Sequence, residues 1–339
     1  MAGVGLITAC GSSDEDSPDV PTVAPATAAQ APASPAAAPA GSTVPAPAGA
    51  RALAASGDTV GVVSPDGRQL LRYDIGAMTT PPTAIDIPEV TALAAGTDGG
   101  YLGVGPGSLV VVDAGGSVRT VDLDAESPTA VVEASTGDVV VGTADGRVLV
   151  YDKDLQKDHD IDSFVRVDAL TAAPASADGL DGQVVVLDRA QSSVTPVDPR
   201  SGELGPALRA GNGATNSTVD RFGRVLVANT RDGEILGFFG SPLVMRFRYP
   251  VADGPYAVDY DDTRDLLWVS TTGNNEVVAY DLADGEPTEK QRFDSVAQPD
   301  RIAVDSAGAV YVLSAREGAL QVVPAPGTSP GATPVGPGR

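Results

Sequence analysis

The sequence predicts an all-β fold over residues 51–323, a seven-bladed β-propeller. Short runs of Val and Leu are bounded by turns rich in Gly, Asp and Pro, which is typical of strands packed on both faces. A pattern of strand, tight turn, strand, turn, strand recurs seven times. The third strands of successive copies end 39, 39, 46, 41, 42 and 42 residues apart. That spacing is the length of a four-stranded antiparallel propeller blade.

The copies differ in clarity. The clear ones are Leu53–Tyr73, Ala130–Tyr151, Thr218–Phe239, Val258–Tyr280 and Ile302–Val323, and the looser ones are Leu93–Val112 and Leu170–Val197. A polar, strand-like segment such as Ser117–Leu123 or Thr288–Phe293 follows most copies, and we expect it to form the outer fourth strand. None follows Val323, so the last blade is expected to be incomplete. Thr43–Pro47 is the candidate to complete it and close the ring.

Other architectures fit less well. A solenoid needs polar capping repeats, and both end copies look like ordinary blades. A β-sandwich does not repeat at this period, and no stretch keeps helical periodicity over three turns. We therefore expect little helix.

Composition excludes several functions. The chain of 339 residues has a formal charge of −23 and a pI near 4.2, so an acidic surface would repel nucleic acid, which needs Lys and Arg for affinity. One Cys and one His exclude a disulfide and a zinc site built from several His. His159 lies in the charged stretch Lys153–Asp162, which predicts a solvated outer strand rather than a catalytic position.

The N-terminus carries an export signature. Ile7-Thr8-Ala9-Cys10 matches the lipobox of bacterial lipoproteins, which predicts a signal segment over residues 1–10 and a lipidated Cys10 bearing palmitate. The expected location is the outer face of the cytoplasmic membrane. Met1–Ala9 lacks the Lys or Arg of a usual signal, which indicates a start further upstream. A cytoplasmic protein with a chance Cys10 is the alternative.

Two segments flank the repeats. Residues 11–50 are rich in Ala, Pro, Ser and Thr, and residues 324–339 are rich in Pro and Gly. Neither composition can bury a core, so both are expected to be disordered. The first would be a tether of about 40 residues that spans roughly 35 Å as a flexible coil.

Some blades resemble known propeller repeats. Pro255-Tyr256-Ala257-Val258, Asn229–Gly233 and Thr272–Asn275 resemble YVTN and NHL-type repeats, and Pro299–Asp305 is similar to NHL repeats most clearly. The resemblance covers the C-terminal third well. With the lipobox and the linker, the chain resembles the conserved lipoproteins of actinobacteria. That resemblance implies a propeller and a membrane anchor, with no established activity.

Aligning the blades predicts a binding surface. Loops before each inner strand and loops between second and third strands share one face, around the central channel. The channel mouth is predicted to carry Arg51, Asp168, Asn216, Tyr256, Asp300 and Arg301. The loops above it add Arg231 and Arg316, together with Arg189, Asn229, Asp232, Asn274, Asn275 and Glu317.

Two interpretations of this cluster remain open. The Arg side chains could bind a carboxylate, a phosphate or an acidic peptide. They could instead pair with Asp168, Asp300 and Asp232 to close the channel. If they bind a ligand, replacing Arg51 and Arg301 by Ala should abolish binding with little loss of stability.

We therefore expect a non-catalytic binding or scaffolding module for an envelope protein, a peptide or an anionic ligand, without a cofactor. The alternative is a metal-dependent hydrolase similar to gluconolactonase-type propellers, with Ca²⁺ held by Asp168, Asn216 and Asp300. No Glu occupies a matching slot, and Arg51 and Arg301 would oppose a cation. The sequence therefore leans away from an enzyme.

Overall fold

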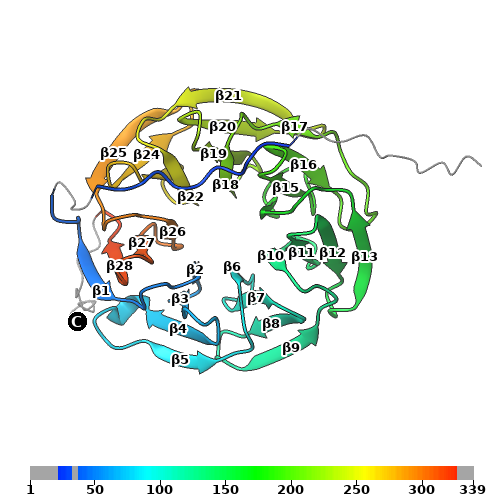
Figure 1. The fold of residues 1–339 in the computed structure, drawn as a ribbon, viewed down its shortest axis with the longest axis horizontal. Helices are drawn as coiled ribbons and strands as arrows, with labels where there is room; N and C mark the ends of the chain where they lie inside the picture. Colours follow the sequence, from blue (N-terminus) through cyan, green and yellow to red (C-terminus); the bar gives the residue numbers. More distant parts are fainter. Residues whose placement is uncertain (1–21, 33–36, 327–339) are drawn as a thin grey trace, which may run out of the picture.

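A computed structural model describes residues 22–32 and 37–326, and these form a seven-bladed β-propeller (Figure 1). Seven antiparallel sheets of four strands each surround a central channel. The only helical element of the described residues is a 3₁₀ turn, η1 (Ile75–Ala77). No helix in these residues has the length and apolar character needed to cross a membrane. The fold class predicted from the sequence is confirmed.

Blades 1 to 6 each use four consecutive strands, and the innermost comes first. Blades 1 and 2 contain β2 (Ala52–Ser56), β3 (Thr59–Val63), β4 (Gln69–Asp74), β5 (Thr83–Asp86), β6 (Ala92–Ala95), β7 (Tyr101–Gly105), β8 (Ser108–Val112) and β9 (Val118–Asp122). Blades 3 and 4 contain β10 (Pro128–Glu133), β11 (Val139–Thr143), β12 (Arg147–Tyr151), β13 (Lys157–Asp162), β14 (Ala169–Ala172), β15 (Val184–Asp188), β16 (Ser193–Val197) and β17 (Leu208–Arg209). Blades 5 and 6 contain β18 (Ala214–Val219), β19 (Val225–Asn229), β20 (Glu234–Phe239), β21 (Val244–Pro250), β22 (Pro255–Asp261), β23 (Leu266–Thr271), β24 (Glu276–Asp281) and β25 (Thr288–Asp294).

Blade 7 combines the two ends of the described chain. It contains β26 (Arg301–Val304), β27 (Val310–Ser314), β28 (Ala319–Val323) and, as its outer strand, β1 (Ser42–Pro45). β1 pairs antiparallel with β28, and Val44 lies opposite Leu320. The predicted closure of the ring by a segment before residue 51 is confirmed, and the strand Ser42–Pro45 overlaps the predicted Thr43–Pro47. Blade 7 therefore has four strands, but its outer strand comes from the N-terminal side of the chain instead of following β28.

Small residues allow neighbouring blades to pack closely. Gly61 of β3 lies under the ring of Tyr101 from blade 2, so a Cβ there would come within 2.7 Å of the ring. A Cβ on Gly142 of β11 would lie 2.1 Å from the Cγ1 of Val167, which leads into blade 4. These gaps are filled by the neighbouring blade, which explains how a chain with 4% aromatic residues packs its blade interfaces.

The outer strands are polar, as expected. β13 (KDHDID) alternates exposed and half-buried residues, and His159 lies on it with Nε2 3.0 Å from the carbonyl of Arg200. The predicted location of this histidine on an outer strand is therefore correct.

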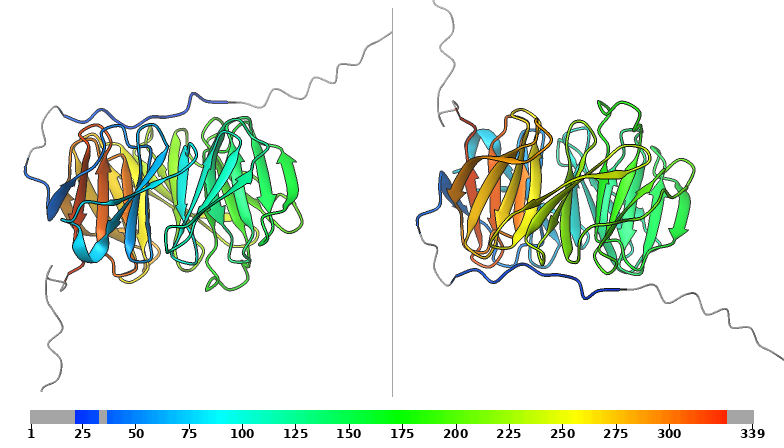
Figure 2. Two further views of the ribbon diagram at one scale, coloured as in Figure 1. Left: turned by 90° about the horizontal axis from the view of Figure 1, so that it is seen from below. Right: turned by 90° about the horizontal axis from the view of Figure 1, so that it is seen from above.

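Part of the predicted linker is ordered on the propeller. We call residues 22–32 the strap. The strap runs across the face of the ring that carries the loops before the inner strands, and it forms neither a helix nor a strand (Figure 2). The prediction of disorder over 11–50 therefore fails for residues 22–32 and for β1. The composition of the segment shows that it cannot form a core of its own. Composition does not show that loops distant in the sequence bind it. Cys10 and most of the C-terminal tail lie outside the described residues.

Candidate binding site at the channel mouth

A cavity of about 360 Å³ opens at the channel mouth, and the first residues of the inner strands line it. Five of the predicted mouth residues line it together: Arg51, Asp168, Asn216, Tyr256 and Arg301. Arg189, from the loop between β15 and β16, lines it too, together with Thr91 and Thr129. The blade alignment thus placed these five side chains correctly around one cavity.

The arginines at the mouth connect neighbouring blades. Arg301 of blade 7 donates from Nε and Nη2 to the carbonyl of Arg51 in front of blade 1, at 3.2 and 2.9 Å. Its Nη1 donates to the carbonyl of Asp300 at 3.1 Å. The guanidinium therefore stabilises the closure of the ring on its inner side, while β1 closes it on the outer side.

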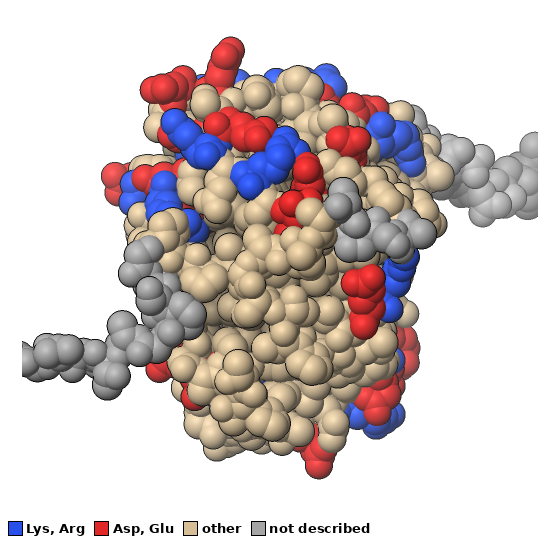
Figure 3. Space-filling model, turned by 90° about the vertical axis from the view of Figure 1, so that its left-hand side faces the viewer, with Lys and Arg blue, Asp and Glu red and all other residues tan. Residues whose placement is uncertain are grey.

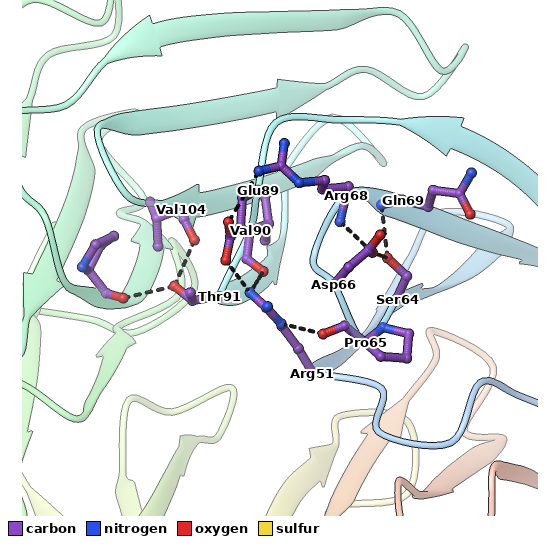
Figure 4. Close-up of polar contacts among 11 residues, drawn as sticks. Arg51, Ser64, Pro65, Asp66, Arg68, Gln69, Glu89, Val90, Thr91 and Val104 are labelled. Carbon is purple, nitrogen blue, oxygen red and sulfur yellow. Dashed lines mark hydrogen bonds and ion pairs between the residues drawn. The ribbon is translucent and has the colours of Figure 1, made fainter.

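Arg51 bends toward blade 2 (Figure 4). Its Nη1 lies 2.9 Å from Glu89 Oε1, and its Nε donates to the carbonyl of Pro65 at 2.8 Å. Arg68 also reaches Glu89, at 3.5 Å. The charge of Arg51 is thus compensated by Glu89, a partner that the sequence interpretation did not consider.

Polar side chains continue this ring of contacts through the other blades. Thr91 donates to the carbonyl of Pro128 at 2.8 Å, and Thr129 donates to the carbonyl of Val167. Arg189 donates to the carbonyl of Thr215 at 2.5 Å and to Asn216 Oδ1 at 3.2 Å. Asn216 in turn donates to the carbonyl of Tyr256 at 3.0 Å. These hydrogen bonds between blades orient the polar side chains of the mouth.

Asp168 is neutralised by local partners. Its side chain is 6% exposed; Oδ1 lies 2.7 Å from Arg166 Nε, and Oδ2 accepts from the Arg189 main-chain N–H at 2.9 Å. The expected pairing of the mouth arginines with Asp168, Asp300 and Asp232 is not found among the described residues. Asp168 pairs with Arg166, and Asp232 accepts hydrogen bonds from the Asn212 main chain and the Asn229 side chain.

The remaining charge of the cavity is positive. In the described part of the chain, neither Arg189 nor Arg301 forms a salt bridge within 4.0 Å, and their hydrogen bonds go to neutral oxygens. A hydrogen bond to a carbonyl leaves the guanidinium charge intact. The mouth thus offers two guanidinium groups outside any ion pair of the described residues, in a chain with a net charge of −23, and Asp300 acts on Arg301 only at longer range.

Three predicted site residues lie elsewhere. Asp300 does not line the cavity; burial raises the pKa of its carboxyl, and its Oδ1 has no hydrogen-bond partner. Arg231 donates to the carbonyl of Asn212 and to that of Ala24 in the strap. Arg316 is exposed between β27 and β28. The sequence places Arg231 and Arg316 in loops that share the face of the mouth, but neither side chain lines the cavity.

The metal hypothesis finds little support in the geometry. Asp168 and Asn216 line one cavity, but Arg166 and Arg189 occupy their oxygen atoms. Asp300 lies outside that lining. Among the described residues no group of three or more His, Cys, Asp or Glu side chains is placed to hold a metal ion.

A second cavity lies between blades 7 and 1, on the opposite face. It measures about 520 Å³ and is mainly apolar, with Ile75, Met78 and Tyr311 in its lining and the buried Asp305 beside them. Both Asp305 oxygen atoms already accept hydrogen bonds, from Tyr311 and from the Ala307 and Ala309 main chains.

Charge is unevenly distributed on the surface that contains β1. Charged side chains gather at the top of this view, and a wide uncharged area lies below them (Figure 3).

Comparison with known proteins supports the fold alone. No protein-family model and no curated protein matches the chain. A catalytically inactive histidine-to-alanine variant of virginiamycin B lyase from Staphylococcus aureus, with quinupristin, is 13% identical with a TM-score of 0.67, and the match covers 82% of this chain and 95% of that one. Hydrazine synthase of Kuenenia stuttgartiensis is 15% identical with a TM-score of 0.69, over 83% and 96%. A mitotic checkpoint complex chain is 13% identical with a TM-score of 0.70, over 89% and 96%. Neighbours of such different functions, all at low identity, define a β-propeller and no particular activity.

Proposed function

We propose that this protein is a non-catalytic binding or scaffolding propeller whose channel mouth recognises an anionic group. The group would belong to a peptide, a protein or a small component of the cell envelope. One observation carries the proposal: Arg189 and Arg301 line the same cavity, and their hydrogen bonds go to neutral oxygens rather than to carboxylates. Guanidinium groups that are already oriented by hydrogen bonds lose little entropy when they bind a carboxylate or a phosphate.

The residues at the mouth favour binding over catalysis. The neighbouring lyase was inactivated by replacing a histidine. The single histidine of this chain, His159, lies on the outer strand β13, away from the mouth. The one thiol of the sequence, Cys10, lies in the N-terminal segment. The described lining of the cavity therefore offers guanidinium and amide groups for recognition and contains neither a histidine nor a thiol.

The proposed address is the outer face of the cytoplasmic membrane, with lipidation at Cys10. This part of the proposal rests on the lipobox Ile7-Thr8-Ala9-Cys10 and on the resemblance to actinobacterial lipoproteins. Mass spectrometry of the purified membrane protein tests it, because acylation would add the mass of the lipid to an N-terminal Cys10. An unmodified chain in the soluble fraction would contradict it.

Isothermal titration with triglutamate at low salt tests binding at the mouth. Arg189→Gln is expected to weaken binding at least fivefold, whereas Arg119→Gln, the same change on exposed β9, should leave it unchanged. Arg189→Lys should retain part of the affinity because it keeps the charge. Equal losses in the Arg189→Gln and Arg119→Gln variants would show nonspecific attraction and contradict the proposal.

A further inference from the structure

The strap is held mainly through its main chain. The side-chain amide of Gln298 donates to the carbonyl of Ala29 at 2.9 Å and accepts from the N–H of Ala31 at 3.1 Å. The main-chain N–H of Val23 donates to the carbonyl of Ala190 at 2.6 Å, and Arg231 donates to the carbonyl of Ala24. Contacts of this type recognise an extended chain whatever its side chains, as in strand addition to a sheet.

Glycines in the loops make room for the small side chains of the strap. Ala26 and Ala31 are each 6% exposed. A Cβ on Gly213 would lie 3.2 Å from the Cβ of Ala26, and a Cβ on Gly254 would lie 2.6 Å from the Cβ of Ala29. The two glycines thus leave space for the methyl groups of Ala26 and Ala29, and a larger side chain at the buried positions of Ala26 and Ala31 would have to displace its neighbours.

Gln298 is held in an unusual conformation. Its φ is +55°, in the left-handed region that side chains other than Gly and Asn rarely adopt. The buried Asn275 fixes it, because Asn275 Oδ1 accepts from the Gln298 main-chain N–H at 2.8 Å. A strained residue that a buried neighbour holds in place is typical of a site whose geometry matters.

We propose that this surface, the strap groove, is a binding site for an extended polypeptide segment with small side chains, and that the strap is its tethered occupant. The groove consists of Ala190, Gly213, Arg231, Gly254 and Gln298, from blades 4 to 7. It lies beside the mouth cavity, whose lining contains no strap residue. This second surface takes a different ligand from the anionic group proposed for the mouth.

The contacts define the partner. Its segment carries Ala or Gly at the positions of Ala26, Ala29 and Ala31, because the groove leaves room for a methyl group there. Pro is accepted between them, since the groove uses the N–H groups of Val23 and Ala31 only. Pro also stiffens the chain and lowers the entropy lost on binding. Such a partner has to displace the strap, which competes at the high effective concentration of a tethered ligand.

The test uses the full chain with a weakened strap. In the released variant, Ala26→Leu with Ala31→Leu, the larger side chains no longer fit the groove. The control, Ala24→Leu with Gln30→Leu, makes changes at exposed strap positions. The probe is a labelled peptide with the sequence of residues 22–32 and blocked ends. Its binding is measured by fluorescence anisotropy, and the fluorescence of buried Trp268 reports folding.

The released variant is expected to bind the probe at least tenfold more tightly than the wild type and the control do. Adding Gln298→Ala to it should weaken binding at least fivefold, and a probe with Leu at the position of Ala26 should not bind. The proposal is overturned if the folded released variant does not bind the probe. It is also overturned if that variant binds the original probe and the probe with Leu at the position of Ala26 equally well. If the double variant does not fold, Ala31→Leu alone takes its place. A negative result for the strap groove does not affect the proposal for the channel mouth, because that proposal is tested separately by triglutamate binding to the Arg189 variants.

Discussion

Arg301 donates two hydrogen bonds, of 3.2 and 2.9 Å, to the main-chain carbonyl of Arg51 and so joins the inner strands of blades 7 and 1. Arg301, which the sequence predicts as a donor to a ligand, therefore also has a structural role. This changes the expected result of replacing them, because binding and stability should now fall together.

Replacing Arg301 should weaken the ring. Arg301→Ala removes both bonds to Arg51 and leaves that carbonyl short of donors, which costs about 1–2 kcal/mol for a half-exposed group. Urea unfolding at equilibrium measures the loss. Arg316→Ala, at an exposed loop position, should change stability by less than about 0.5 kcal/mol. Equal stability of the two variants would exclude the structural role of Arg301.

The outer closure depends on Val44. This side chain is 7% exposed and packs in a cluster with Tyr73 and Leu320. Val44→Asp would bury a charge without a partner, and we expect a loss of more than about 3 kcal/mol. Thr43→Asp, at the exposed position next to it in β1, should be nearly neutral. Thermal unfolding distinguishes them, and similar melting temperatures would mean that β1 contributes little.

The half-buried carboxyl of Asp259 should make stability depend on pH. Burial raises the pKa of Asp259 to about 6, although Thr218 and the main-chain N–H groups of Tyr260 and Val304 bond to it. The folded state thus keeps a proton that the unfolded chain loses near pH 4. The stabilisation is complete below about pH 4 and is lost as the pH rises through 6.

Asp259→Asn should therefore be more stable than the wild type at pH 7.5, by up to about 3 kcal/mol, and should lose this advantage toward pH 4.5. Urea unfolding at several pH values measures the difference. Asp284→Asn, in the exposed turn before β25, is the control and should follow the wild type. A constant difference between Asp259→Asn and the wild type over this range would refute the buried-carboxyl explanation.

The blade interfaces tolerate few added atoms. Gly142→Ala would place a Cβ 2.1 Å from Val167, so blades 3 and 4 would have to separate, at about 1–3 kcal/mol. Gly115→Ala would approach only the Asp113 side chain, at 3.2 Å, and should be close to neutral. Differential scanning calorimetry of the two variants compares these costs. No difference would indicate that the interface repacks freely.

The sequence predicted what repeats and missed what differs between blades. Arg51, Asn216 and Arg301 were located because each occupies an equivalent slot before or at the start of an inner strand. Glu89 and Arg189 lie in connections whose lengths vary, so alignment of the blades could not reveal their contacts. Their hydrogen bonds depend on distances between blades, which a one-dimensional pattern does not contain.

The strap was missed for a related reason. Composition measures whether a segment can bury its own side chains, and residues 22–32 cannot. Their order comes from main-chain bonds to loops such as the one that carries Gln298, more than 260 positions away in the chain. The one sequence signal for an ordered strap is its series of small residues, Ala26, Ala29 and Ala31, because small side chains can pack against loop glycines.

The pairing of β1 with β28 also constrains how the protein is made. Ala40, just before β1, accepts a hydrogen bond from Gln321, a residue 281 positions later. β1 therefore leaves the ribosome long before its partner exists, and the ring stays open until β28 has been synthesised. Contacts so distant in sequence form slowly. Completion of blade 7 is expected to follow synthesis, and until then the edge of β1 is available to other chains.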